Sequence, residues 1–262
     1  MDFKGKVILI SGATGGMGSE IAKKLAKEEC KLILIARREE KLKDMCEKFS
    51  SNKTECIYKK CDVSNKEEVR EAVKFAHKKY GRIDLAILTA GILIPNPIET
   101  MDSGIIEKSM KINFFGTVYF LENLFSVMKK QKTATIAVTS TLPDGRGLAG
   151  WGAYGASKAA ISWLVESLRA EAKQKYNINL LTIKPGSVET PMIKDYHRPG
   201  SVTSDVAADV ILRGIRKEKK VIQFPIMQVI VIKVGEIVPP FLYDIVPISH
   251  RKGPDYPEPE EK

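Results

Sequence analysis

Tyr154 and Lys158 stand four residues apart at the start of a predicted helix, Tyr154–Lys175, so their side chains share one helix face. A free tyrosine has a pKa of about 10, too high for ready proton exchange at neutral pH. An ammonium group a few ångströms away favours the phenolate and lowers that pKa. The pair could therefore act as a general acid toward a ketone or as a general base toward an alcohol. The same spacing recurs by chance in helices, so its meaning depends on the surrounding residues.

Further polar side chains are expected near this pair. Ser140 and Thr141 follow a predicted strand, Thr133–Thr139, at the carboxyl edge of the sheet where such folds bind ligands. One of the two hydroxyls could hydrogen-bond a substrate carbonyl and stabilise its developing negative charge. Asn113 is a polar residue in an otherwise apolar stretch of the predicted helix Ile105–Met128. If buried, Asn113 needs a partner such as a backbone carbonyl or an ordered water; the alternative is a polar residue that only kinks the helix.

A glycine-rich turn joins the first predicted strand, Lys6–Ser11, to the first predicted helix, Met17–Glu28. Glycines let the chain turn tightly and let a pyrophosphate approach the backbone. The helix N-terminus offers free N–H groups and the positive end of its dipole to such an anion. Its place between a strand and a helix makes the turn a stronger sign of a nucleotide site than glycine spacing alone. The expected cofactor contacts here are Gly12, Thr14, Gly15, Gly16, Met17 and Gly18.

The end of the second predicted strand, Lys31–Ala36, indicates which nucleotide is bound. NAD-binding folds usually carry an acidic residue there, which bonds the ribose hydroxyls. This chain has Arg37 and Arg38 instead, and no carboxylate before Glu39. An arginine binds a 2′-phosphate through paired N–H groups, whereas a carboxylate would repel it. We therefore expect NADP (NADPH), with Arg37 as the main contact and Arg38 as a second one; the alternative is that both arginines are surface charges at a helix start.

An alternation of strands and helices must position these groups. It predicts a doubly wound, Rossmann-type α/β fold, with a parallel sheet of about seven strands covered by helices on both faces. Ser64 and Glu67 have the spacing of a capping box at the start of a helix. Without an internal repeat or a flexible linker, a single catalytic domain is expected over residues 1–251. The other predicted elements are strands at Glu55–Lys60, Asp84–Thr89, Asn179–Lys184 and Lys220–Phe224 and helices at Glu39–Phe49 and Asp205–Arg216.

Composition narrows the class of protein. The net charge of +10 is spread along the 262 residues and interleaved with glutamates, so no nucleic-acid partner is expected. The four cysteines and three histidines lack metal-site or disulfide-framework spacing, and free thiols suit a reducing cytosol. A strand begins near the N-terminus, which leaves no room for a signal peptide. A cytoplasmic enzyme without a bound metal is expected.

The last part of the chain differs from the rest. Residues 225–251 are strongly apolar, but charged residues and prolines interrupt them, so they should not span a membrane. Three alternatives remain: this segment lines an apolar substrate pocket, packs against another subunit, or contacts a membrane surface peripherally. Residues 252–262 are rich in proline and glutamate and are expected to be a disordered tail.

The motifs occur in a set order: the glycine turn, Asp62-Val63, Thr89-Ala90-Gly91, Asn113, Ser140-Thr141, Tyr154 with Lys158, and Pro185-Gly186. Together they closely resemble the short-chain dehydrogenase/reductase family, across roughly residues 5 to 225. The resemblance implies that Tyr154 donates the proton, that Lys158 tunes Tyr154 and binds the nicotinamide ribose, and that Asn113 holds a water in a proton relay. In the same pattern, an arginine at the position of Arg37 accompanies NADP. The remaining cofactor contacts implied by the family are Asp62 and Val63 at the adenine, Val188 and Thr190 at the carboxamide, and Ala90, Gly91, Pro185 and Gly186.

The sequence departs from the family pattern in three places. Thr89 replaces an asparagine whose side chain stabilises the central sheet, so that bond must be replaced or lost. Ser11 replaces a threonine and keeps the hydroxyl. The family's serine lies thirteen residues before the tyrosine, which is the position of Thr141. A one-residue insertion in 143–147 would select Ser140 instead, and because successive strand residues face opposite sides, only one of the two can point at the substrate.

The combined prediction is an oxidoreductase that transfers a hydride between NADPH and a small-molecule ketone or secondary alcohol. The stretch Gly147–Tyr154 is similar to that of 3-ketodihydrosphingosine reductases, which favours a lipid-like substrate. One alternative is an epimerase or dehydratase, although those relatives usually have a larger C-terminal domain. Another is a catalytically silent nucleotide-binding scaffold or sensor, although such proteins tend to lose the tyrosine or the lysine. A homodimer or homotetramer is expected, because this fold commonly buries its long helices between subunits.

Overall fold

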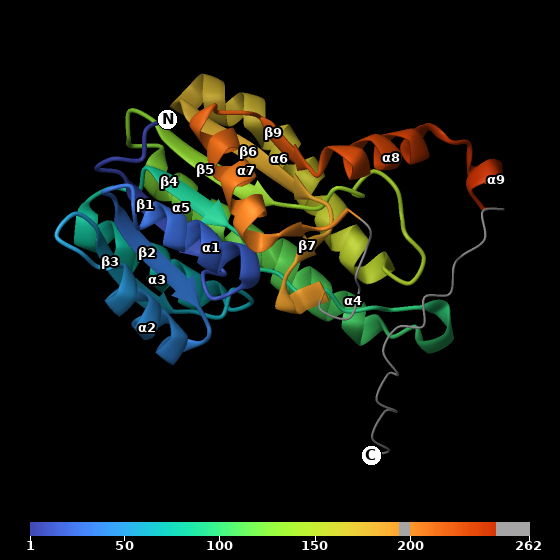
Figure 1. The fold of residues 1–262 in the computed structure, drawn as a ribbon, viewed down its shortest axis with the longest axis horizontal. Helices are drawn as coiled ribbons and strands as arrows, with labels where there is room; N and C mark the ends of the chain where they lie inside the picture. Colours follow the sequence, from blue (N-terminus) through green and yellow to red (C-terminus); the bar gives the residue numbers. More distant parts are fainter. Residues whose placement is uncertain (194–199, 245–262) are drawn as a thin grey trace, which may run out of the picture.

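The computed structural model describes residues 1–193 and 200–244 (Figure 1). Seven parallel strands form the central sheet in the order β3-β2-β1-β4-β5-β6-β9. The doubly wound Rossmann-type fold predicted from the sequence is therefore confirmed, as a single domain. The proposed tail, 252–262, and residues 245–251 of the apolar segment lie outside the described residues. The strands are β1 (Val7–Ser11), β2 (Lys31–Ala36), β3 (Glu55–Lys60), β4 (Leu85–Leu88), β5 (Ala134–Thr139), β6 (Ile178–Pro185) and β9 (Val221–Phe224).

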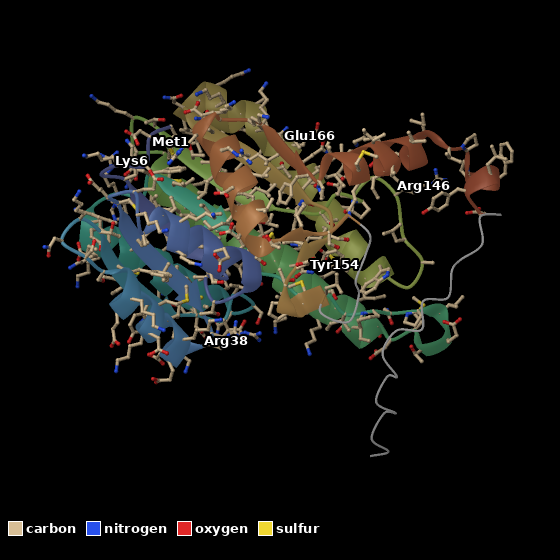
Figure 2. The ribbon with its side chains drawn as sticks, in the orientation of Figure 1. Met1, Lys6, Arg38, Arg146, Tyr154 and Glu166 are labelled. Atoms are coloured by element: carbon tan, nitrogen blue, oxygen red, sulfur yellow. The ribbon has the colours of Figure 1, made fainter. Side chains whose placement is uncertain are left out.

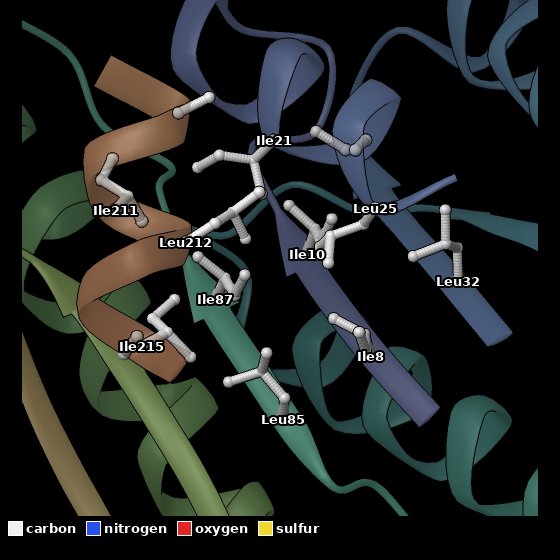
Figure 3. Close-up of a cluster of buried hydrophobic side chains, with 14 of the residues drawn as sticks. Ile8, Ile10, Ile21, Leu25, Leu32, Leu85, Ile87, Ile211, Leu212 and Ile215 are labelled. Carbon is white, nitrogen blue, oxygen red and sulfur yellow. The ribbon is translucent and has the colours of Figure 1, made fainter. Parts of the chain in front are cut away.

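The sheet is covered on both faces, which explains why every residue of the inner strands β1, β4 and β5 is buried and why these strands are mostly apolar rather than alternating. On one face pack α1 (Gly16–Leu25), α2 (Glu39–Phe49) and α7 (Ser204–Arg216), and on the other α3 (Lys66–Tyr80), α5 (Gly116–Met128) and α6 (Gly152–Tyr176). Figure 3 shows the first of these layers, where side chains of β1 and β4 meet those of α1 and α7. The labelled residues are Ile8, Ile10, Ile21, Leu25, Leu32, Leu85, Ile87, Ile211, Leu212 and Ile215, all of them buried.

The start of α3 differs by one residue from the capping box expected at Ser64. Asn65 is the N-cap, and its side chain accepts hydrogen bonds from the backbone N–H groups of Glu67 and Glu68. Ser64 lies one residue earlier, and both its N–H and its hydroxyl donate to Asp62. The reciprocal carboxylate is accordingly Glu68, which accepts from the side chain of Asn65 at 3.0 Å.

The long helix expected over Ile105–Met128 is interrupted. It consists of α4 (Ser103–Ser109), a π-helical segment (Met110–Phe115) and α5. Asn113 lies in the π-helical segment and is fully buried. Such π-helical turns within helices are frequently found at functional sites. Asn113 thus lies where the helix departs from regular α-helical geometry.

The chain after the sheet forms two short helices, α8 (Ile226–Ile237) and α9 (Pro240–Tyr243), which extend beyond the sheet in Figure 1. Neither has a buried residue. Among the described residues, no helix is long and apolar enough to cross a membrane. A second, two-stranded sheet pairs β7 (Val188–Glu189) with β8 (Val202–Thr203), and short 3-10 turns cover Ile98–Thr100 and Pro191–Ile193.

Candidate active site

Two cavities lie at the carboxyl ends of the strands. The first, of about 840 Å³, is bounded by the glycine turn and the ends of β2, β3 and β4, and we call it the nucleotide cavity. The second, of about 440 Å³, contains Tyr154 and Thr141, and we call it the substrate cavity. Met17, Thr190 and Met192 line both, so the two cavities adjoin. Figure 2 shows Arg38 and Tyr154 among the side chains of this edge of the sheet.

The glycine turn has the close backbone approach expected of a nucleotide cradle. Gly12 has a φ of 70°, and a Cβ on Gly12 would lie 2.7 Å from the backbone nitrogen of Ala90. A Cβ on Gly18 would collide with the carbonyl oxygen of Gly12. No side chain caps α1 at Gly15, so the N–H groups of its first turn remain available to an anion. These features fit a pyrophosphate-containing cofactor.

Three cationic side chains surround the far end of the nucleotide cavity: Arg37, Arg38 and Lys41. Arg38 folds over the turn, and its guanidinium donates to the carbonyl oxygen of Thr14 at 2.5 Å and to the hydroxyl of Thr14 at 3.2 Å. Lys41 donates to the same carbonyl at 3.0 Å. Lys41 was not singled out from the sequence, although it lies one helical turn after Arg37 and Arg38 on α2. Arg37 is exposed at the cavity rim.

Asp62 and Val63, expected at the adenine, also line the nucleotide cavity. Burial raises the pKa of Asp62, but two hydrogen bonds from Ser64 and the charges of Arg37 and Lys111 outweigh it, so the pKa lies below its ordinary value. Asp62 is therefore ionised at neutral pH and offers acceptor oxygens only.

The hydroxyl of Tyr154 forms a hydrogen bond with Thr141. Burial raises the pKa of Tyr154, and this hydrogen bond only partly opposes the rise. The lowering expected from Lys158 is not found, because burial and the bond to Thr141 account for the pKa of Tyr154. The ammonium group of Lys158 lies 6.0 Å from the centre of the Tyr154 ring and donates to the carbonyl oxygen of Thr139 at 2.9 Å. A tyrosine that stays neutral is suited to donating a proton.

Burial also changes Lys158, whose side chain is enclosed between β5 and α6. Removal from water lowers the pKa of Lys158 from 10.5 to about 8. Its bond to Thr139 holds the amine beside the nucleotide cavity: a Cβ on Gly91, which lines that cavity, would lie 3.4 Å from the lysine nitrogen.

Ser140 and Thr141 lie in different environments. Thr141 lines the substrate cavity beside Tyr154. The hydroxyl of Ser140 instead donates to the carbonyl oxygen of Lys158 at 2.9 Å and accepts from the hydroxyl of Ser162 at 2.8 Å. Ser140 is fully buried and is not part of the cavity wall. The geometry thus places Thr141, the residue in register with the family's serine, next to the tyrosine.

Asn113 has three side-chain hydrogen bonds. Its oxygen accepts from the N–H of Ile92 at 2.8 Å, and its amide donates to the carbonyl of Ile92 at 3.0 Å and to the hydroxyl of Ser157 at 2.9 Å. Ser157 in turn donates to the carbonyl of Tyr154. The partners of Asn113 thus include the backbone carbonyl expected for a buried asparagine, and through Ile92 and Ser157 the side chain connects the loop after β4 to the first turn of α6.

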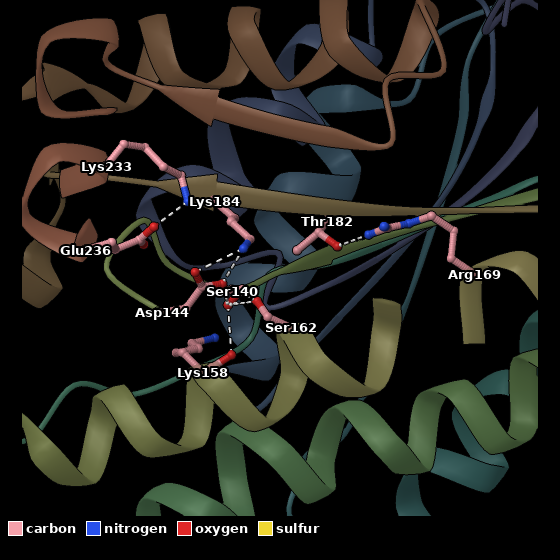
Figure 4. Close-up of polar contacts among 9 residues, drawn as sticks. All are labelled: Ser140, Asp144, Lys158, Ser162, Arg169, Thr182, Lys184, Lys233 and Glu236. Atoms are coloured by element: carbon pink, nitrogen blue, oxygen red, sulfur yellow. Dashed lines mark hydrogen bonds and ion pairs between the residues drawn. The ribbon is translucent and has the colours of Figure 1, made fainter. Parts of the chain in front are cut away.

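A buried polar network behind the site was not anticipated from the sequence (Figure 4). Lys184 on β6 and Asp144 form an ion pair with a nitrogen–oxygen distance of 2.7 Å, and Asp144 is also bonded to Ser162. Ser162 bonds Ser140. A lysine near the end of a mostly buried strand was the available signal, because a buried charge needs a partner. The network holds the loop that follows β5 against the sheet.

Thr89, which stands where the family pattern has an asparagine, makes a hydrogen bond within the central sheet. Its hydroxyl donates to the carbonyl oxygen of Ser11 at 2.7 Å, which joins the end of β4 to the end of β1. Of the remaining expected contacts, Thr14, Gly16, Ala90 and Gly91 line the nucleotide cavity, Pro185, Gly186 and Val188 line the substrate cavity, and Thr190 lines both.

The apolar segment after β9 contributes to the substrate cavity. Met227, Gln228, Val231 and Ile232 of α8 form part of its wall. Met227 and Val231 are nevertheless about two-thirds exposed, at 67% and 66%. The substrate cavity therefore opens beside an apolar helix. Within residues 225–244, the apolar segment forms part of the cavity wall.

A Rossmann-type sheet with a phosphate-binding turn, and a tyrosine, lysine and hydroxyl at its carboxyl edge, defines a nucleotide-dependent oxidoreductase site. The family model described as short chain dehydrogenase matches residues 6–199. The chain belongs to the short-chain dehydrogenase family, as the sequence resemblance predicted. Members of this family are oxidoreductases that bind a nicotinamide cofactor and act on small molecules.

Comparisons with individual proteins support the same family membership. The chain is 34% identical to an uncharacterized oxidoreductase of Listeria monocytogenes over 195 residues, covering 74% of this chain and 79% of that protein. It is 31% identical to the 3-ketodihydrosphingosine reductase of Mus musculus over 201 residues, covering 74% of this chain and 60% of that protein. The crystal structure of a short-chain dehydrogenase/reductase from Burkholderia phymatum in complex with NAD superposes with a TM-score of 0.82 at 20% identity, covering 90% and 94% of the two chains.

Proposed function

We propose that this chain is an NADPH-dependent reductase of a ketone whose carbon arms are apolar. The observation that carries the proposal is the joint placement of the Tyr154 and Thr141 hydroxyls in a mostly apolar cavity that adjoins the nucleotide cavity. A carbonyl oxygen between these hydroxyls would have two donors, and the nicotinamide supplies the hydride when bound.

Each protein group has a separate task in this proposal. Thr141 holds the carbonyl oxygen, and Tyr154 transfers its phenolic proton to that oxygen as negative charge develops. Lys158, held by Thr139, stabilises the resulting phenolate and binds the nicotinamide ribose. Asn113 keeps the first turn of α6 in place through Ser157, and its family role in holding a relay water is part of the same proposal.

The preference for NADPH rests on charge. Arg37, Arg38 and Lys41 put three cations beside the end of β2, where NAD-specific folds usually carry a carboxylate. Paired N–H groups of arginine match the oxygens of a 2′-phosphate. Asp62, ionised beside Arg37, contacts the adenine side of the cavity in this proposal.

The apolar α8 wall favours a lipid-like substrate, as does the similarity to 3-ketodihydrosphingosine reductase. Peripheral contact of α8 with a membrane surface and a cytoplasmic location are further parts of the proposal. We also propose that the protein forms a homodimer or homotetramer through α5 and α6, where Trp163 is 78% exposed. Measurement of the protein's mass in solution tests this oligomeric state.

A substrate panel tests the reaction class. NADPH oxidation would be followed against ketones ranging from short alkanones to long-chain keto-lipids, with wild-type protein and Tyr154→Phe. We expect activity to increase with apolar arm length, and Tyr154→Phe to lose it by about 10³-fold or more while the Kd for NADPH changes little, because the phenyl ring keeps the shape of the wall. Full activity of Tyr154→Phe would remove the tyrosine from the mechanism. Inactivity of the wild-type protein toward the whole panel, with NADPH bound, would favour the silent nucleotide-binding scaffold.

A charge reversal tests the cofactor preference. Arg37→Glu should raise the Kd for NADPH by about 10²-fold and change that for NADH by less than about threefold, because only NADPH carries the 2′-phosphate. Fluorescence titration with both cofactors measures this directly. Arg70→Glu, a substitution of an exposed arginine on α3, is the matched control. Equal weakening of both cofactors would contradict the assigned role of Arg37.

A further inference from the structure

Two cysteines face each other outside the site. The sulfur of Cys46, on α2, lies 2.8 Å from the sulfur of Cys56, on β3. Both side chains are buried in the hydrophobic layer on the α1 side of the sheet. The two other cysteines have different surroundings: Cys30 donates to the carbonyl of Leu25, and Cys61 lies in the layer on the opposite face.

The local chain holds this pair together. α2 and β3 are joined by a short turn in which the N–H of Ser51 donates to the carbonyl of Thr54 at 2.9 Å. The hydroxyl of Thr54 donates to the carbonyl of Ala26 at 3.0 Å, so the turn is also attached to the end of α1. Because the backbones on both sides are fixed and the sulfurs are already in contact, a covalent bond needs only small side-chain rotations.

Other uses of the pair fit less well. Among residues 1–193 and 200–244, no group of three or more histidine, cysteine or acidic side chains could hold a metal ion. The contact with Cys46 and burial both raise the pKa of the Cys56 thiol, and a thiol that stays protonated is a poor nucleophile. A catalytic thiol is therefore disfavoured, whereas a bond formed during folding, or while this edge of the sheet is open, would afterwards be shielded from reductants.

We propose that Cys46 and Cys56 form an intramolecular disulfide bond when the protein meets a small-molecule disulfide such as oxidised glutathione. When local opening of this edge exposes the pair, one cysteine loses its proton to water, and its thiolate attacks a sulfur of oxidised glutathione, forming a mixed disulfide and releasing one reduced glutathione. The second cysteine, after losing its proton to water, attacks the protein sulfur of the mixed disulfide and releases the second glutathione. The protein loses two protons and two electrons, the equivalent of two hydrogen atoms, and oxidised glutathione gains them.

The bond would join α2 to β3, the edge strand of the sheet. It would restrict the unfolded chain and keep the edge strand paired. It would lie away from the nucleotide cavity, whose residues near these elements are Arg37, Arg38 and Lys41 around the first turn of α2 and Asp62 after the end of β3. The proposal therefore does not rest on the proposed function, and oxidation should leave NADPH oxidation rates unchanged.

Thiol counting tests the bond. The folded protein would be incubated with oxidised glutathione, freed of reagent, unfolded in guanidinium and titrated with a thiol reagent. We expect two of the four cysteines to react, an intact mass reduced by two hydrogens, and a protease fragment linking Cys46 to Cys56. The Cys30→Ser and Cys61→Ser variants should form the same link, whereas Cys46→Ser should not. Four reactive cysteines with unchanged mass, a stable glutathione adduct, or a link through Cys30 would each overturn the proposal.

Thermal unfolding gives an independent readout. We expect the Tm of the oxidised wild-type protein to exceed that of the reduced protein by roughly 5 to 10 °C. The Cys46→Ser and Cys56→Ser variants should show no such difference. If either variant fails to fold, the oxidised and reduced forms of the wild-type protein can still be compared. Their sequence is the same, so this comparison alone tests the proposal. An equal Tm for the two forms would mean that the bond does not stabilise this edge.

Discussion

Thr141 and Ser140 are neighbours with the same functional group, yet only Thr141 reaches the substrate cavity. Backbone bonds from Ser140 to Ile183 and from Leu142 to Pro185 continue the ladder of β5 and β6 past the end of β5. The chain is therefore extended here, and successive side chains point to opposite sides. Ser140 faces Lys158 and Ser162, and Thr141 faces Tyr154.

Substitution of each hydroxyl separates the two roles. Thr141→Ala should lower kcat/KM by about 10²-fold or more, because it removes a donor to the developing charge on the carbonyl oxygen. Ser140→Ala should lower it by less than about tenfold but reduce Tm, because it leaves buried partners unpaired. Steady-state kinetics and thermal unfolding of the two variants give the comparison. A larger kinetic loss in Ser140→Ala would reverse the assignment.

α8 has no buried residue, so a few polar contacts set its position. The side chain of Gln228 accepts from the N–H of Ser187 at 2.8 Å. At the other end, Arg146 donates to the carbonyl oxygen of Gly235 at 2.8 Å and to that of Val238, and its guanidinium lies 3.8 Å from the centre of the Tyr243 ring. Carbonyls in the last turn of a helix lack helical partners, which makes them good acceptors for this arginine. Arg146 thus holds α8 and α9 to the loop that carries the substrate-cavity residues.

Loss of this contact should affect large substrates most. In Arg146→Gln, we expect the KM for a long-chain ketone to rise about three- to tenfold, because α8 is the cavity wall that contacts an apolar arm. The KM for a short ketone and the Kd for NADPH should change less than about twofold. Arg70→Gln, at an exposed arginine far from α8, serves as control. An equal loss for short and long ketones would show that Arg146 does not act through α8.

For the whole molecule, Lys158 links catalysis to stability. Its pKa is about 8 in the folded protein and 10.5 as its ordinary value, because burial disfavours the ammonium form. Between these values the unfolded chain binds more protons than the folded one, so this residue makes stability rise with pH across the window. Below about pH 8 the folded protein contains a buried ammonium group, which donates to the carbonyl oxygen of Thr139.

Removal of that charge should stabilise an inactive protein. Lys158→Met should raise the free energy of unfolding by about 1 to 3 kcal/mol at pH 7, after allowing for the lost hydrogen bond to Thr139. The gain should shrink as pH rises from 8 to 10.5. Urea unfolding of the wild-type protein and of Lys158→Met at several pH values measures the difference in their free energies of unfolding. The titration of all other groups cancels in this difference. A difference that is independent of pH would contradict the shifted pKa.

Local signals were sufficient for the fold class and for most of the nucleotide cavity. Apolar runs, helix periodicity and a glycine turn depend on residues close together in the chain, and parallel strands bring their carboxyl ends to one edge. The residues expected to contact the cofactor accordingly line the two cavities, from Gly12 at the first turn to Thr190, except Lys158, whose amine lies behind Gly91 at the edge of the nucleotide cavity. The order of motifs along the chain identified the family without any knowledge of packing.

Side-chain direction and distant partners were decided only by the tertiary structure. Thr141 lines the cavity because the chain stays extended beside β6, and Lys184 is tolerated inside a strand because Asp144 pairs with it. Cys46 and Cys56 meet because a helix packs on an edge strand, although their spacing gave no sign of pairing. Such contacts depend on how elements pack in three dimensions. The sequence by itself therefore determined the class of chemistry, whereas the packing determined which hydroxyl faces the substrate cavity, which carboxylate pairs with the buried lysine and which two cysteines meet.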